Sequence, residues 1–132
     1  MDERVIIKGR IVSGKGEGAY YMGLQGYRSQ FIEKLGIDPY PGTLNVKVGR
    51  VSLGALSRMF ESKGIPIKGF LHDGKHLGGV VAHMASVSGV KCAVIVPEMS
   101  SHRQVAEVIS RENLRNRFHA SDGEEIEILV TL

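Results

Sequence analysis

Six short runs rich in β-branched residues, separated by glycine- and proline-containing turns, constrain the fold of this chain more than any other feature. The first run is rich in β-branched residues with polar residues interleaved, and the second places Leu44, Val46 and Val48 on one face of a strand. Strands and short helices follow one another without a regular strand-helix-strand alternation. The pattern therefore predicts a mostly β barrel whose strands cover residues 4–13, 43–48, 65–71, 79–87, 90–96 and 124–132.

Three short helices are expected between these strands. Apolar side chains recur every fourth residue before Gly36, and Ser52 precedes a second apolar stripe that it can cap. The pattern predicts helices over residues 26–35, 53–63 and 111–118. Residues 105–110 are interpreted as a short apolar segment that leads to the last of these helices.

The composition is that of an ordinary globular protein. Of 132 residues, 42% are hydrophobic and 23% are charged, which predicts a single domain over residues 1–132. No run approaches the roughly 18 apolar residues that span a bilayer, and the polar start at Met1 is unlike a signal peptide, so we expect a cytoplasmic protein without a membrane partner. The one cysteine, Cys92, lies in an apolar run and is interpreted as a core residue.

A glycine-rich segment follows the first strand. Ser13–Tyr20 carries glycines at three alternate positions, and consecutive backbone N–H groups in such a segment can bind phosphate. It lacks the Gly-Lys-Ser/Thr of a Walker A loop and the surrounding pattern of a dinucleotide fingerprint. The segment is expected to be a loop, either a phosphate-binding loop or a plain flexible turn.

A second candidate site begins at the turn before the strand at 43–48. Strand alternation places the hydroxyl of Thr43 and the carboxamide of Asn45 on the same face. Neutral oxygens of this kind suffice for Mg²⁺ when the ion is bound to a nucleotide, because phosphates and waters supply the remaining ligands. The alternative is a structural turn with no ligand.

Two polar segments near the C-terminal end complete the candidates. Ser100-Ser101-His102 and Glu107 follow a strand that ends at a proline, where loops often carry function, although a solvated loop is the alternative. In the helix that begins near Glu112, helical spacing leaves Arg115 free, and a solvated helix is the default there. The remaining histidines show no metal-ligand spacing and receive no function.

Taken together, four ordered motifs resemble those of the archaeal-type CTP-dependent riboflavin kinases. They are Ser13-Gly-Lys-Gly-Glu-Gly, Asp38-Pro-Tyr-Pro-Gly-Thr-Leu-Asn, Val94-Ile-Val-Pro with Ser100 and His102, and Leu114-Arg115 followed by Asp122-Gly123. The resemblance covers nearly the whole chain, and the second motif is the most specific. It implies a six-stranded cradle-loop barrel with short helical insertions, and transfer of the CTP γ-phosphate to the 5′-hydroxyl of riboflavin to give FMN and CDP.

The resemblance also implies a role for particular residues. Thr43 and Asn45 would hold Mg²⁺, and Ser100 and Glu107 would contact the flavin. Ser100 stands where the family more often has threonine, and the segment from Ser100 to Glu107 is one residue shorter than the family pattern. Glu107 and His102 have suitable chemistry for a base, and neither is assigned that role. The cytidine nucleotide would contact Lys15, Gly16, Glu17, Gly18, Ala19, Tyr20, Glu112, Asn113, Leu114 and Arg115.

Two other functions stay open from the sequence. The first is a non-catalytic cradle-loop barrel that acts as a binding module or DNA-binding regulator, because the net charge is +3. The basic residues are spread evenly rather than clustered, so a nucleic-acid partner is not expected. Some family members carry an additional helix-turn-helix domain, which is not expected before the first strand here. The second is a kinase with a different nucleotide or acceptor. Nothing in the sequence predicts the oligomeric state.

Overall fold

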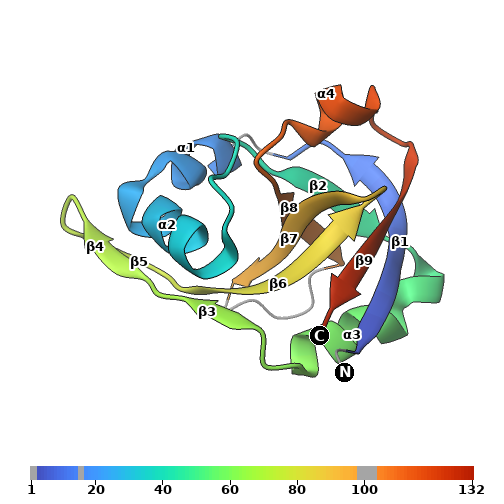
Figure 1. Cartoon of the computed structure of the whole chain (residues 1–132), viewed down its shortest axis with the longest axis horizontal. Helices are drawn as coiled ribbons and strands as arrows, with labels where there is room; N and C mark the ends of the chain where they lie inside the picture. The colour runs from blue at the N-terminus through green and yellow to red at the C-terminus, as the bar shows by residue number, and fades with distance from the viewer. Residues whose placement is uncertain (1–2, 15–16, 98–103) are drawn as a thin grey trace.

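The computed structural model describes residues 3–14, 17–97 and 104–132, and its centre is a closed antiparallel barrel (Figure 1). The six barrel strands pair in the order β6-β7-β8-β2-β1-β9, and β9 pairs with β6 to close the ring. The prediction of a mostly β fold with a six-stranded barrel is confirmed. The strands are β1 (Arg4–Val12), β2 (Leu44–Val48), β6 (Val80–Val87), β7 (Val90–Pro97), β8 (Val105–Ile109) and β9 (Glu125–Thr131).

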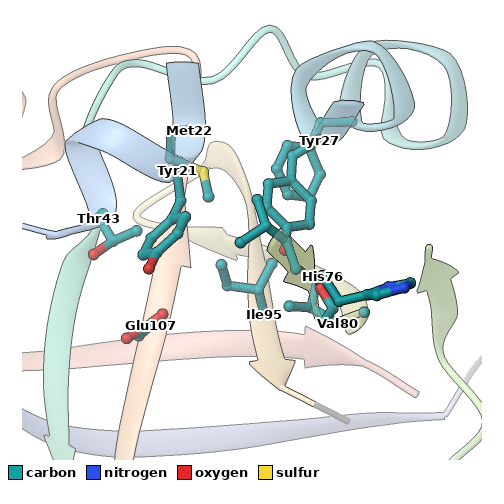
Figure 2. A pocket seen from close by; sticks show the side chains of 13 residues that line it. Tyr21, Met22, Tyr27, Thr43, His76, Val80, Ile95 and Glu107 are labelled. Carbon is teal, nitrogen blue, oxygen red and sulfur yellow. Dashed lines mark hydrogen bonds between the residues drawn. The ribbon is translucent and has the colours of Figure 1, made fainter. Parts of the chain in front are cut away.

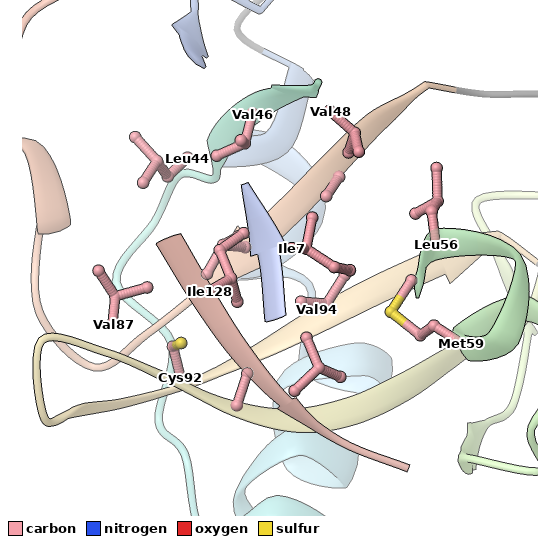
Figure 3. Close-up of a cluster of buried hydrophobic side chains, with 14 of the residues drawn as sticks. Ile7, Leu44, Val46, Val48, Leu56, Met59, Val87, Cys92, Val94 and Ile128 are labelled. Atoms are coloured by element: carbon pink, nitrogen blue, oxygen red, sulfur yellow. The ribbon is translucent and has the colours of Figure 1, made fainter. Parts of the chain in front are cut away.

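The barrel closes around apolar side chains that alternate along its strands. Ile7, Val46 and Ile128 are fully buried, and they come from the three neighbouring strands β1, β2 and β9 (Figure 3). Burial of a side chain of this size contributes about 1.5–3 kcal/mol. Cys92 lies in the same core, so its interpretation as a core residue is confirmed.

The predicted strand over 65–71 is wrong in its second half. The chain forms β3 (Ile65–Ile67), which pairs with β6, and then leaves the barrel to form a separate hairpin. Gly69 marks the break, because a Cβ at this position would lie 2.2 Å from the Leu77 carbonyl oxygen. The hairpin consists of β4 (Phe70–His72) and β5 (Lys75–Leu77), joined by the expected turn.

The interpretation of residues 105–110 as a simple apolar segment also needs correction. Residues Val105–Ile109 form strand β8, which pairs with β2 on one side and β7 on the other. Its alternation is incomplete, since both Val108 and Ile109 are buried, one toward each of the two core clusters. Two paired neighbours satisfy its backbone, which a pattern within one short segment does not reveal.

The helices differ in detail from the prediction. A helix over 26–35 is confirmed, with Gly36 at a φ of +67° at its end. Ser52 precedes a helix but does not cap it, because its hydroxyl instead accepts a hydrogen bond from the Lys8 amide at 2.9 Å. The elements are α1 (Glu17–Gly23), α2 (Gln25–Gln30), the π-helical η1 (Phe31–Leu35), the 3₁₀ turn η2 (Arg50–Ser52), α3 (Leu53–Glu61) and α4 (Leu114–Phe118).

The helices α1, α2 and η1 form a layer on the outside of the barrel, near the β4–β5 hairpin (Figure 1). Tyr27 of α2 packs edge-on against Phe70 of β4 with ring centroids 4.6 Å apart. Gln30 accepts from the Lys68 amide at 2.7 Å and donates to the Lys68 carbonyl at 2.9 Å. The helical layer and the hairpin are therefore held against each other.

Within the described chain, no helix has the length and apolar character needed to cross a membrane.

Candidate active site

A pocket of about 320 Å³ lies between the helical layer and the outer side of the barrel. Figure 2 shows that its lining side chains come from α1, α2, the barrel strands and the hairpin segment. Its volume is at the lower end of the range for small-molecule sites. The lining residues are Gly18, Tyr21, Met22, Tyr27, Phe31, Thr43, His76, Leu77, Gly78, Gly79, Val80, Ile95 and Glu107.

One end of this pocket is aromatic and apolar. Tyr27 and Phe31 are stacked with centroids 6.5 Å apart, and Ile95 and Val80 face them from the barrel (Figure 2). The Tyr27 hydroxyl donates to the Gly78 carbonyl at 2.6 Å, and burial raises the pKa of this phenol. This end suits a flat ring with an apolar face, because binding removes the apolar surfaces of the ring and of the pocket from water.

The other end of the pocket is polar. Thr43, Tyr21 and Glu107 meet there, with the Tyr21 hydroxyl pointing toward Glu107 (Figure 2). Glu107 of β8 lies directly opposite Asn45 of β2 in the strand register. Side chains of opposed residues project to the same face of a sheet and approach within a few ångströms. The predicted flavin residue Glu107 and the predicted metal ligands Thr43 and Asn45 are therefore neighbours.

The glycine-rich segment runs against both predicted metal ligands. A Cβ on Gly14 would lie 2.1 Å from the Asn45 amide nitrogen, and a Cβ on Gly18 would lie 2.8 Å from the Thr43 hydroxyl oxygen. The absence of side chains at both positions is what permits this approach. The expectation of a loop over the whole segment is wrong from Glu17 onward, because these residues begin α1 and pack on the end of β2.

A second, smaller pocket of about 170 Å³ lies on the other side of Thr43. It contains all four of the predicted nucleotide residues near α4, together with Tyr40 from the proline-rich turn. Thr43 contributes to the wall of both pockets. The lining residues are Tyr40, Gly42, Thr43, Leu44, Val108, Ser110, Glu112, Asn113, Leu114 and Arg115.

The prediction that Arg115 is free is wrong. Its side chain connects α4 to the end of β1. Its guanidinium donates to the Asp122 carboxylate at 2.5 Å and to the Val12 carbonyl at 3.2 Å. Asp122 also accepts a hydrogen bond from the Ser13 hydroxyl. These hydrogen bonds, from Ser13 and Arg115, hold the pKa of the Asp122 carboxyl below its usual value. The network joins α4 to the end of β1 and to Ser13, where the glycine-rich segment starts.

The other residues of α4 have structural contacts of their own. The helix begins at residue 114 rather than 111, because the Asn113 side chain caps it by accepting from the Asn116 amide at 3.3 Å. Leu114 is buried in the barrel core. Glu112 pairs with Arg117 at 3.2 Å.

The remaining predicted residues fall into two groups. Lys15, Gly16, Ser100 and His102 are outside the described residues, and so is the Glu17 side chain. Ala19 and Tyr20 are exposed on α1, and neither lines the two pockets described above. Within α1, the residues that face the larger pocket are instead Gly18, Tyr21 and Met22.

Thr43 and Asn45 fit a nucleotide-bound magnesium ion. They offer a hydroxyl directly before β2 and a carboxamide oxygen within it, and Glu107 is opposite Asn45 in the strand register. Mg²⁺ prefers oxygen ligands and usually keeps several waters and substrate phosphates. Among the described residues, no group of three or more His, Cys, Asp or Glu side chains could hold a metal ion.

Comparison with known proteins assigns the family. The sequence model of the CTP-dependent riboflavin kinases, described as domain of unknown function DUF120, matches residues 11–130. The chain belongs to this family. It is 45% identical over 127 residues to a riboflavin kinase of Ignicoccus hospitalis, which aligns 96% of this chain with 71% of that protein.

Two further relatives show the same similarity over part of a longer protein. Riboflavin kinases of Picrophilus torridus and Archaeoglobus fulgidus are 44% and 41% identical over 94% and 99% of this chain. The chain spans 56% and 57% of these two relatives, little more than half of their length.

Several residues that line the larger pocket of this CTP-dependent riboflavin kinase family member were not predicted from its sequence. Tyr21 and Met22 follow Gly18 by three and four positions, which is the spacing of one helix face. This spacing is present in the sequence, but it indicates a common face only when the segment is known to be helical. His76 lines the pocket because the β4–β5 hairpin leaves the barrel, a departure that the predicted strand over 65–71 did not include.

Proposed function

We propose that this chain transfers the γ-phosphate of CTP to the 5′-hydroxyl of riboflavin, giving FMN and CDP. One observation carries the proposal: Thr43 lines both the larger pocket and the smaller pocket. A phosphoryl group that moves from a nucleotide to an acceptor must pass between their binding sites. A metal ligand in the common wall is placed where that transfer takes place.

The larger pocket suits riboflavin. Its apolar end, formed around Tyr27 and Phe31, accepts the flat isoalloxazine ring. Its polar end, at Thr43 and Glu107, accepts the hydroxyl-bearing ribityl chain. This orientation brings the 5′-hydroxyl, at the end of the chain, to the wall shared with the smaller pocket.

The smaller pocket suits the nucleotide. The segment Glu112–Arg115 lines it, and the network through Asp122 holds that segment beside the end of β1, where the glycine-rich segment starts. Backbone N–H groups in a glycine-rich turn bind phosphate oxygens well. The preference for CTP rests on the family resemblance and on the name of the matching family model.

Magnesium belongs to the proposal as the counter-charge of the phosphates. Thr43 and Asn45 would hold it, and the ion would neutralise negative charge on the transferred group. The chain itself fixes the two ligands: β2 pairs on both sides, and Gly14 and Gly18 pack against their side chains. Such fixed positions favour transfer, because phosphoryl transfer depends mainly on positioning and charge stabilisation.

The proposed step balances as a simple displacement. The riboflavin 5′-oxygen forms a bond to the γ-phosphorus, and the bond from that phosphorus to the oxygen bridging to the β-phosphate breaks. CDP leaves with the bridging oxygen, and the hydroxyl proton is released. The residues of the larger pocket orient the acceptor, and those of the smaller pocket orient the donor.

The test is an FMN-formation assay. Purified protein is incubated with riboflavin, Mg²⁺ and CTP, ATP, GTP or UTP in separate reactions, and FMN is separated from riboflavin by chromatography. FMN is expected with CTP and in much smaller amounts with the purine nucleotides. No FMN with any nucleotide would refute the kinase assignment, whereas FMN formed equally well with ATP would refute only the cytidine preference.

The DNA-binding alternative gains no support from the basic side chains on β1. Lys8 pairs with Glu127 at 3.5 Å, and Arg10 pairs with Glu125 at 3.1 Å. These cations face carboxylates on the adjacent strand β9. A surface that binds phosphate backbones presents its cations without such partners.

A further inference from the structure

We propose that Tyr21 binds the ribityl chain of riboflavin and so lets the protein distinguish riboflavin from flavins that lack this chain. The inference rests on the proposed function, because it assumes that the larger pocket takes a flavin. It concerns a residue in α1 that was not among the predicted site residues.

The position of Tyr21 follows from the helical spacing of α1. Gly18 packs against Thr43, and Tyr21 lies on the same face one turn later. Figure 2 shows its ring between Thr43 and the apolar end of the pocket, with the hydroxyl pointing toward Glu107. Tyr21 therefore occupies the stretch of pocket between the proposed ring site and the proposed transfer site.

The two tyrosines that line this pocket use their hydroxyls differently. The Tyr27 hydroxyl is bound to the Gly78 carbonyl at 2.6 Å and serves the protein itself. For Tyr21, no hydrogen bond from the hydroxyl is found within residues 3–14, 17–97 and 104–132. Its ring contacts Tyr20 edge-on, with centroids 5.3 Å apart.

The chemistry of the two ends of riboflavin determines which part of the ligand lies beside Tyr21. The isoalloxazine ring suits the apolar end, and the reacting 5′-hydroxyl must reach Thr43, so the ribityl chain has to pass Tyr21. Each ribityl hydroxyl can donate and accept a hydrogen bond, and a phenol can do the same. The Tyr21 hydroxyl is thus matched to the ribityl hydroxyls that pass it, whereas the ring lies toward the apolar end around Tyr27 and Phe31.

The test compares riboflavin with lumiflavin, which has the same ring but a methyl group in place of the ribityl chain. Dissociation constants are measured by quenching of flavin fluorescence for the wild type and for Tyr21→Phe. The Phe variant keeps the ring wall and removes only the hydroxyl. The ratio of lumiflavin to riboflavin dissociation constants is expected to fall by about three- to tenfold, the net contribution of roughly one neutral hydrogen bond.

Tyr27→Phe is the matched control, because it removes a phenol from the same pocket at the ring end. Both ligands share the ring, so this variant should leave the ratio unchanged even if both affinities fall. An unchanged ratio in Tyr21→Phe, or an equal loss for both flavins, would overturn the inference.

Steady-state kinetics give a second readout. Tyr21→Phe should raise KM for riboflavin by about three- to tenfold and leave KM for CTP unchanged. A rise in KM for CTP alone would overturn the inference. If the wild type makes FMN but the flavin ratio does not respond to Tyr21→Phe, only this inference fails. If the wild type binds neither flavin, the proposed function fails with it.

Discussion

Gly18→Ala tests whether the glycine-rich segment positions Thr43. The added Cβ would lie 2.8 Å from the Thr43 hydroxyl oxygen and 3.0 Å from its methyl carbon, so either Thr43 or α1 must move. Overpacking of this kind costs about 1–3 kcal/mol. Alanine in place of glycine inside a helix returns about 1 kcal/mol. The free energy of unfolding should therefore fall by only about 0–2 kcal/mol.

Activity should respond more strongly than stability to the same change. A displacement of a positioning group by up to 1 Å can lower the rate by about a hundredfold, so we expect kcat/KM for CTP to fall about ten- to a hundredfold. The Mg²⁺ concentration for half-maximal activity should rise as well. FMN formation at varied Mg²⁺ and urea unfolding of the same preparation measure the two effects.

Gly23→Ala is the matched control for this experiment. Gly23 lies at the end of the same helix, and a Cβ there would meet nothing within 4 Å. Its activity and Mg²⁺ dependence should equal those of the wild type, with no loss of stability. The reasoning is refuted if Gly18→Ala retains wild-type kcat/KM and Mg²⁺ dependence, or if Gly23→Ala loses as much activity.

Four further predictions concern particular side chains. Thr43→Ala combined with Asn45→Ala should lower turnover more than about a hundredfold at limiting Mg²⁺ while the far-UV circular dichroism stays unchanged, and preserved turnover would contradict the metal assignment. Asp122→Asn should raise KM for CTP more than KM for riboflavin, because it loosens Arg115 beside the smaller pocket. Since the pKa of Asp122 is lowered in the folded state, its stabilising contribution is present above the ordinary carboxyl pKa of 3.8 and is lost as the pH falls below it. Urea unfolding between pH 5 and pH 2 should therefore show a shallower pH dependence for Asp122→Asn than for the wild type. Burial raises the pKa of Cys92 to about 12, so the native protein should react with a thiol reagent at pH 8 far more slowly than the urea-unfolded chain; equal rates would contradict the burial.

Most of the barrel could be predicted because its strands carry a local signal. Side chains alternate across a strand with a period of two, and one face of β1 and β2 is buried. Turns at glycines, such as Ser88-Gly89 between β6 and β7, also carry their own signal, since Gly89 has a φ of +80°. The closure of the ring between β6 and β9 could not be predicted from pattern, because it pairs residues far apart in the sequence.

The site was predictable only where it coincides with such local signals. The predicted strand over 43–48 brought Thr43 and Asn45 to one site, and the structure places Asn45 in β2 and Thr43 directly before it, with Gly14 and Gly18 beside their side chains. The helix α1 was missed because glycine is a poor helix former, and the propensity of the segment gave no support for a helix. The packing of Gly18 against Thr43 favours the helix α1. This tertiary contact cannot be predicted from the sequence of the segment alone.

The two pockets are formed by different elements, so the kinetic parameters for the two proposed substrates should respond to different substitutions. The acceptor pocket depends on the helical layer, which Tyr27 and Gln30 tie to the β4–β5 hairpin. The donor pocket depends on α4, which Arg115 ties to the end of β1. Among the described residues, Thr43, directly before β2, is the one that lines both pockets. Under the proposed function, changes in the helical layer should therefore alter the parameters for riboflavin, changes around α4 should alter those for the nucleotide, and changes at Thr43 should alter both, because the proposed transfer passes through the wall that Thr43 shares.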